Sequence, residues 1–90
     1  MNAASPLLDT TALAASLLEP VRNFVTTSLK RPVPDATNIF ESGLVSSMFG
    51  MQLIMYMEKS FSIMVLDEDL DLGNFSSIEN IARFIARKRQ

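Results

Sequence analysis

The chain contains neither cysteine nor histidine among its 90 residues. Without cysteine it has no disulfide framework, no thiol nucleophile and no cysteine metal site. Without histidine it lacks the commonest general base and the commonest zinc ligand, so a hydrolase of the Ser-His-Asp type cannot be built from this chain alone. No other cluster of catalytic groups stands out in the sequence. We therefore expect a protein that is not an enzyme.

A strong excess of charge of one sign is also missing. Eight Lys and Arg stand against ten Asp and Glu, which gives a net charge of -2. Surfaces for nucleic acid are strongly basic, so we expect no nucleic-acid partner. No apolar run is long enough to span a membrane. The apolar residues near the N-terminus follow no Lys or Arg and are interrupted by Asp9, which argues against a signal peptide. We expect a cytoplasmic protein.

The residues that are present suit one small domain, because 48% of them are hydrophobic and can form a single core. Apolar residues recur at helical spacing in the first third of the chain: Leu17, Val21, Phe24, Val25 and Leu29. Ser16-Leu17-Leu18-Glu19 has the form of a capping box, and proline is tolerated near a helix start. These signals predict a first helix that begins at Ser16 and has Pro20 in or just past its first turn. Residues 1–15 then form a lead-in that can include a short turn of helix.

A long connection, from residue 30 to residue 45, follows this helix. Pro32 and Pro34 end the helix, because residues before proline avoid the helical region. Three apolar residues are expected to hold the connection on the core: Ile39, Phe40 and Leu44. A loop of this length in a small domain is more often functional than slack.

A second helix is predicted from Ser46 to Ser60, after a glycine and two serines. One face of it carries the residues expected in the core: Gly50, Leu53, Ile54, Met57 and Phe61. A second stripe carries Met48, Met51 and Met55, with Gln52 and Glu58 beside it. A small domain can rarely bury both faces of a helix, and methionine is common on adaptable binding surfaces. We expect this stripe to meet solvent or a partner; the alternative is that the long connection covers Met48 and Met51.

The rest of the chain predicts a short helical turn at residues 66–70 and a last helix that begins at Ser76. Ser76-Ser77-Ile78-Glu79 again has the form of a capping box. The apolar face of the last helix consists of Ile78, Ile81, Ala82 and Ile85, with Phe84 at its edge. The basic tail of this helix is expected to be solvated at the negative end of the helix dipole: Arg87, Lys88 and Arg89.

Alternating aspartates precede the last helix at positions 67, 69 and 71, and Gly73 follows them. They do not fit a calcium loop, because the glycine falls one place late and Ile78 takes the twelfth position in place of glutamate. We interpret them as a solvated acidic surface. No segment shows the regular alternation of apolar and polar residues that is typical of a strand. The predicted fold is therefore all-α: a small bundle of three main helices and one short helix over residues 16–90, with a long loop between the first and second helices.

This layout resembles that of the acyl carrier and peptidyl carrier protein family, from Ser16 to Lys88. In that family the second helix opens with Asp-Ser-Leu, and the serine carries a phosphopantetheine arm. The matching residues here are Ser46, Ser47 and Met48, and the register back from Phe61 to Leu53 assigns the modified serine to Ser47. Glu58 stands where the family often has an acidic residue that faces partners. Asp67-Glu68-Asp69 is similar to the acidic segment before the family's short third helix.

The resemblance implies that Ser47 carries a covalent 4'-phosphopantetheine, and that the chain has no catalytic or metal-binding residues. It implies docking through Met48, Met51, Met55 and Glu58. The partners would be a phosphopantetheinyl transferase, an acyl-loading enzyme, and downstream synthase or tailoring enzymes. The carrier itself would be a monomer and would not bind membranes. The family's aspartate helps to position the transferase's magnesium and coenzyme A, so Ser46 in that slot implies less efficient modification.

The second helix is less acidic than in carriers of the fatty-acid type. The chain looks most like stand-alone carriers of polyketide and mixed peptide-polyketide pathways, which serve antibiotic biosynthesis. In particular, it is similar to those that carry glyceryl-derived extender units such as methoxymalonyl. A competing interpretation is a non-modified helical interaction domain that binds an amphipathic helix through the same Met-rich face, with both serines acting as plain caps. It explains the methionines equally well, but it explains less well why a long loop with prolines, a glycine and a serine precede that helix at carrier spacing.

Overall fold

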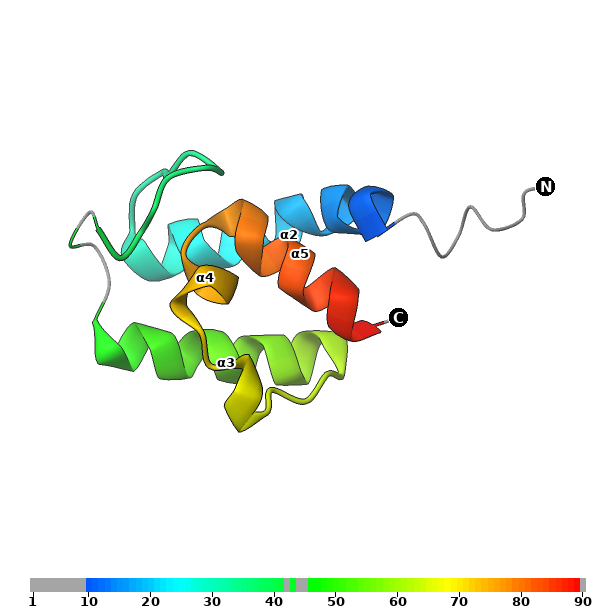
Figure 1. Cartoon of the computed structure of the whole chain (residues 1–90). Helices are drawn as coiled ribbons and strands as arrows, with labels where there is room; N and C mark the ends of the chain where they lie inside the picture. Colours follow the sequence, from blue (N-terminus) through cyan, green and yellow to red (C-terminus); the bar gives the residue numbers. More distant parts are fainter. Residues whose placement is uncertain (1–9, 42, 44–45, 90) are drawn as a thin grey trace.

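The computed structural model describes residues 10–41, 43 and 46–89. This part of the chain folds as four α-helices, namely α2 (Thr10–Leu29), α3 (Ser47–Phe61), α4 (Leu72–Phe75) and α5 (Ile78–Arg89), with a 3-10 turn, η1, at Asp67–Asp69 (Figure 1). The described residues contain no strand. The predicted small helical bundle, with three main helices and one short one, is confirmed.

Helix α2 is longer than the sequence signals predicted. It runs without interruption from Thr10 to Leu29 with Pro20 inside it, so the predicted start at Ser16 is wrong. Residues 10–15 of the predicted lead-in are helical, but they belong to α2 and not to a separate turn of helix. Residues 1–9 lie outside the described part of the chain. The Ser16 hydroxyl does not cap a helix but donates to the Leu13 carbonyl at 2.7 Å. Burial of Ala14 and Leu17 against the core outweighs the hydrogen bond that Pro20 removes.

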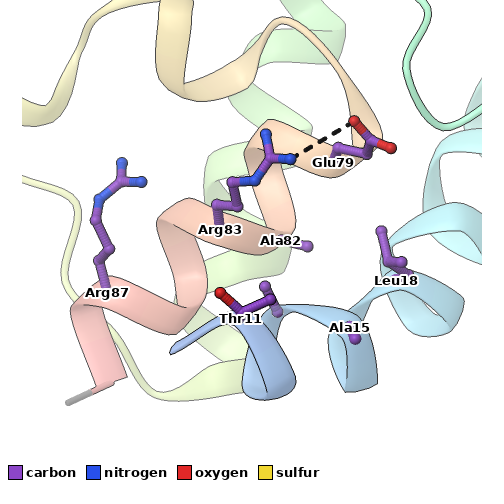
Figure 2. Close-up of a pocket in the computed structure, with 8 residues that line it drawn as sticks. Thr11, Ala15, Leu18, Glu79, Ala82, Arg83 and Arg87 are labelled. Atoms are coloured by element: carbon purple, nitrogen blue, oxygen red, sulfur yellow. Dashed lines mark ion pairs between the residues drawn. The ribbon is translucent and has the colours of Figure 1, made fainter. Parts of the chain in front are cut away.

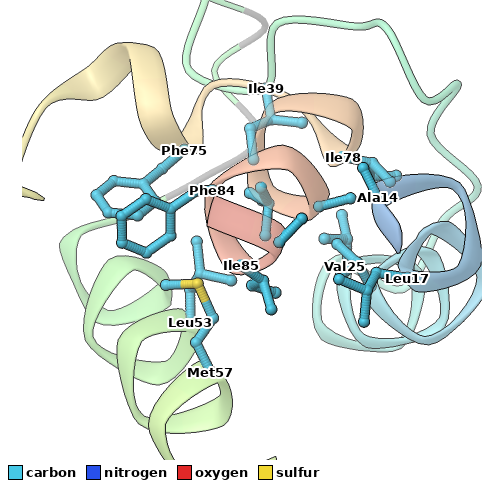
Figure 3. Close-up of a cluster of buried hydrophobic side chains, with 14 of the residues drawn as sticks. Ala14, Leu17, Val25, Ile39, Leu53, Met57, Phe75, Ile78, Phe84 and Ile85 are labelled. Atoms are coloured by element: carbon cyan, nitrogen blue, oxygen red, sulfur yellow. The ribbon is translucent and has the colours of Figure 1, made fainter. Parts of the chain in front are cut away.

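Helices α2 and α5 form the closest helix pair of the molecule. Alanines lie where they meet, including Ala15 and Ala82 (Figure 2). Every residue of the predicted α5 face is buried, and Phe84, predicted at its edge, is only 1% exposed. Figure 3 shows the resulting cluster, in which Phe75 and Phe84 lie close together with ring centroids 5.1 Å apart.

Helix α3 reaches α2 through large aromatic side chains. The Tyr56 ring stacks on Phe24 with a centroid separation of 4.2 Å, and its other contact is edge-on with Phe61 at 5.5 Å. The Tyr56 hydroxyl donates to the Pro20 carbonyl at 3.1 Å, and burial raises the pKa of this hydroxyl. On the core side, Leu53 and Met57 are fully buried as predicted, and Phe49 joins them.

The connection between α2 and α3 is tied to both α2 and α5. Arg22 donates from Nε and Nη2 to the two carboxylate oxygens of Asp35 at 2.8 and 2.7 Å. The Glu79 N–H donates to the Asp35 carbonyl, and the Ile39 N–H donates to the Ser76 carbonyl. Ile39 is fully buried and Phe40 is partly buried against the core, as predicted; Leu44 lies outside the described residues. The loop is therefore part of the packed structure.

Helix α5 begins at Ile78, two residues after the predicted start at Ser76. Ser77, and not Ser76, accepts the N–H of Asn80 with its hydroxyl, at 3.1 Å. Ser76 is instead the C-cap residue of α4 and has a helical backbone conformation. Helix α4 was not predicted; it begins where the Asp71 carboxylate accepts the Gly73 N–H at 2.7 Å.

The acidic segment and the basic tail are only partly solvated, which corrects both predictions. Lys88 Nζ lies 2.7 Å from Asp69 Oδ2, and both side chains are less than a quarter exposed. The Asp69 carboxylate also accepts the Leu66 N–H. These two hydrogen bonds lower the pKa of Asp69. The pair fixes η1, predicted as a helical turn at residues 66–70, to the end of α5.

Candidate functional site

The two serines that open α3 have different surroundings. Ser46 is the N-cap: its backbone is extended, and its hydroxyl accepts the Phe49 N–H at 3.3 Å. Ser47 is the first helical residue and its side chain is exposed. Within the described part of the chain, the Ser47 hydroxyl has no hydrogen-bond partner. The cap therefore occupies Ser46 and leaves Ser47 available for chemistry.

The chain enters α3 by a turn at Gly43, whose φ of 72° is a conformation that suits glycine. The start of a helix leaves its first N–H groups without intrahelical acceptors and carries a partial positive charge. The first turn of α3 contains no acidic residue. An anion attached at Ser47 would meet a favourable field there.

A groove of about 310 Å³ begins at Ser47. It runs between α3 and the segment that contains α4, and its lining is mostly apolar: Phe40, Gly50, Met51, Leu53, Ile54, Leu70, Leu72 and Phe75, with Asp71. Ser46 lines a different groove, with Leu29, Phe49 and Gln52. The two serines therefore face different surfaces.

The methionine stripe of α3 is exposed. Met48 and Met51 are each 67% exposed, and Met55 is 54% exposed. The predicted exposure is confirmed, and the alternative in which the loop covers Met48 and Met51 is wrong. Contiguous exposed apolar surface is typical of a contact site for another molecule. The docking role itself stays a prediction.

The sequence reasoning missed part of this apolar surface. Leu70 and Leu72 are 57% and 68% exposed and line the Ser47 groove opposite Met51. Met64 and Leu66, in the connector before η1, are also exposed. The signal that could have found them is the recurrence of large apolar residues at even positions, interrupted only by Glu68: Met64, Leu66, Leu70 and Leu72.

Glu58, predicted to face partners, is half-buried and has a local contact. Its carboxylate accepts the Val65 N–H at 3.0 Å, and its carbonyl accepts the N–H of Ser62, which ends α3 in a left-handed conformation. Glu58 therefore orients the connector after α3. Its contact with partners stays a prediction.

The acidic residues near the site have structural partners. Asp69 is paired with Lys88, and Asp71 caps α4. Over residues 10–41, 43 and 46–89 no group of three or more acidic side chains is arranged to hold a metal ion. Among the described helices, none has both the length and the apolar character that a membrane crossing requires.

Comparison with known proteins does not assign a family to this chain. No protein-family model, no curated protein and no solved structure matches it.

Proposed function

We propose that this chain is a carrier protein that holds an acyl group on a 4'-phosphopantetheine arm at Ser47 and presents it to biosynthetic enzymes. The observation that carries the proposal is the difference between the two serines. Ser46 uses its hydroxyl to cap α3, whereas the Ser47 hydroxyl is exposed and has no partner in the described residues. A transferase needs a hydroxyl that it can reach, and of the two serines that open α3, Ser47 combines access with an oxygen that makes no hydrogen bond within the described residues.

The surroundings of Ser47 fit the group. The arm is joined through a phosphodiester, and the N-terminus of α3 offers free N–H groups and no acidic side chain to a negative charge. The groove that begins at Ser47 offers apolar surface beside the attachment point. When bound, the arm supplies a thiol that holds the acyl group as a thioester. This chain supplies the attachment oxygen, the field around it and the surface that partners recognise.

The exposed methionine stripe supports docking by apolar contact. Met48, Met51 and Met55 lie on the same helix as Ser47, so an enzyme that binds them is placed next to the arm. Tethering then raises the effective concentration of the acyl group at that enzyme. We assign this face, with Glu58 at its far end, to a phosphopantetheinyl transferase, an acyl-loading enzyme and downstream synthase or tailoring enzymes in the cytoplasm. By resemblance, the pathway is polyketide or mixed peptide-polyketide assembly, with a methoxymalonyl-type unit as the cargo.

The test is an intact mass of the chain after incubation with coenzyme A, magnesium and a broad-specificity phosphopantetheinyl transferase. In the expected reaction, a bond forms between Ser47 Oγ and phosphorus, and the pyrophosphate bond of coenzyme A breaks to release 3',5'-adenosine bisphosphate. The mass should rise by one phosphopantetheine. Ser47→Ala should abolish the gain, and Ser46→Ala is the matched control that should keep it. The opposite pattern would assign the arm to Ser46, and no gain with a cognate transferase as well would reject the carrier function.

The exposed apolar surface also favours a second candidate, an interaction domain that is never modified. The four large exposed side chains beyond α3 extend the surface without any need for an arm: Met64, Leu66, Leu70 and Leu72. On this hypothesis, no transferase modifies the chain, and a partner helix binds the wild type and Ser47→Ala equally well. The same mass experiment therefore separates the two functions.

A further inference from the structure

A second groove, with a volume of about 270 Å³, lies between the first half of α2 and α5 (Figure 2). Its floor consists of small or apolar side chains: Ala14, Ala15, Leu18 and Ala82. Arg83 and Arg87 stand along its α5 side. In Figure 1, α2 begins and α5 ends at one end of the bundle, and α3 begins at the other. The groove therefore does not belong to the Ser47 site.

The floor of this groove is open because its alanines do not fill the space between the two helices. Ala15 is exposed, and no charged residue occurs in α2 before Glu19. Small side chains allow another backbone to come close, since the distance between packed helices depends on the side chains at the contact. The surface suits one or two apolar side chains of a second molecule.

The positive charges of the two arginines beside the floor are not compensated by a carboxylate at hydrogen-bonding distance. Arg87 donates from Nη2 to the neutral Asn74 amide oxygen at 2.8 Å, and it has no carboxylate partner among the described residues. Arg83 donates to the Asn80 amide oxygen at 2.9 Å, and its nearest carboxylate, Glu79 Oε1, lies at a longer 3.8 Å. Helix α5 carries one glutamate against three arginines and one lysine. The charged residues that line the groove are Glu79, Arg83 and Arg87, so its lining carries a net positive charge in a chain whose net charge is negative.

We propose that this groove binds an acidic amphipathic helix of a partner protein. Arg83 and Arg87 are one helical turn apart, a spacing at which side chains on a helix are neighbours. Two carboxylates one turn apart on a partner helix have the same spacing and can each reach one arginine. An apolar residue between them then lies over the alanine floor, as in other complexes in which a helix binds a groove. A basic or neutral helix would leave the arginines without a counter-charge.

This inference does not depend on the carrier function, but it gives that function a second contact. A partner held at the α2–α5 groove would leave the methionine face of α3 free for a succession of enzymes. Holding the chain at one site raises the local concentration of the other site around the same assembly.

The experiment selects binders for the unmodified full-length chain from a displayed library of random 16-residue peptides at low salt. Enriched peptides are then synthesised and titrated against three proteins: wild type, Arg83→Gln/Arg87→Gln and Lys30→Gln/Arg31→Gln. The last is the matched control, because it removes two exposed positive charges outside the groove. Circular dichroism of each variant checks that the helical fold is kept.

The expected peptides carry two acidic residues one helical turn apart beside an apolar residue. Their affinity should fall about ten-fold in Arg83→Gln/Arg87→Gln, since two partly exposed ion pairs are lost, and should hold within about two-fold in the control. Equal losses in both variants would mean general attraction by charge and would overturn the proposal. It is also overturned if the library yields no enriched peptide, or only peptides that bind all three proteins equally. Because every titration uses chain without an arm, failure of the carrier function cannot produce these outcomes.

Discussion

Met51 and Met57 lie on the same helix, six residues apart, and differ in exposure. Met51 is 67% exposed, whereas Met57 is fully buried in the cluster of Figure 3. Truncation of each to alanine therefore separates surface from core within one element. Met57→Ala should lower the free energy of unfolding by about 2–5 kcal/mol, because the lost apolar contacts leave a cavity. Met51→Ala should change it by no more than about 0.5 kcal/mol, because solvent fills the space.

These changes are large enough to tell apart in a domain of this size. A loss of 1 kcal/mol lowers Tm by roughly 4–8 °C in a small domain. Met57→Ala should therefore lower Tm by at least about 8 °C, and Met51→Ala by less than about 4 °C. Urea unfolding followed by circular dichroism gives the free energies, and an unchanged slope shows that the unfolded state is comparable in each variant.

The result that would refute this reasoning is a similar loss in both variants. It would mean that Met51 is covered in solution and that the methionine stripe is part of the core. If Met51 is exposed, Met51→Glu becomes the variant that tests docking. It should lower turnover by a partner enzyme while leaving the unfolding transition nearly unchanged, because it places a charge on an apolar contact surface.

Two further predictions concern the cap of α3 and the ion pair that holds the long loop. Ser46→Ala should lower the free energy of unfolding by about 0.5–2 kcal/mol, because the Phe49 N–H loses its acceptor. Ser47→Ala should change it by no more than about 0.5 kcal/mol. A urea-unfolding experiment in which Ser47→Ala is the more destabilising change would contradict this assignment of the cap. The hydrogen bonds from Arg22 lower the pKa of Asp35 below its ordinary value of 3.8, so the stabilisation is present above that value and is lost as the pH falls through the lowered pKa. Wild type and Asp35→Asn should therefore differ in free energy of unfolding near neutral pH and converge below about pH 4; a difference that stays constant with pH would show that the pair does not stabilise the fold.

Much of the fold follows from local signals in the sequence. The apolar spacing of α3 and α5 predicted most of their buried residues, because a helix in a small bundle has one face toward a single core. It missed Phe49 and Ala86, which are buried as well. The prolines at 32 and 34 correctly predicted the end of α2. The start of α3 was predicted within one residue, because Ser46 is a strong cap and the apolar run follows at once.

The errors arose where distant contacts decide the outcome. A capping box at Ser16 and a proline at position 20 are strong local signals for a helix start, yet the packing of α2 against α5 extends the helix back to Thr10. Helix α4 is too short for its apolar residues to recur at helical spacing, and it depends on the Asp71 cap and the burial of Phe75. The pairing of Lys88 with Asp69 joins residues 19 positions apart, and no pattern within either segment predicts it.

For the candidate site, the sequence predicted the exposed methionines, and the family resemblance assigned the arm to Ser47, but residue identity alone did not show which serine caps α3. Both residue identities allow capping. Only the hydrogen bond to Phe49 shows which serine is occupied. The grooves were not predictable either, since each is formed by segments that are far apart in the chain.

The stacking of Tyr56 on Phe24 gives the molecule a built-in optical reporter. The chain has one tyrosine and no tryptophan, so its near-ultraviolet absorbance and emission arise chiefly from a single side chain at the α2–α3 junction. The hydroxyl of that tyrosine donates to the Pro20 carbonyl inside α2. Any event that shifts α3 against α2, whether docking on the methionines or loading of Ser47, would alter the ring's environment and can be followed in real time without a label.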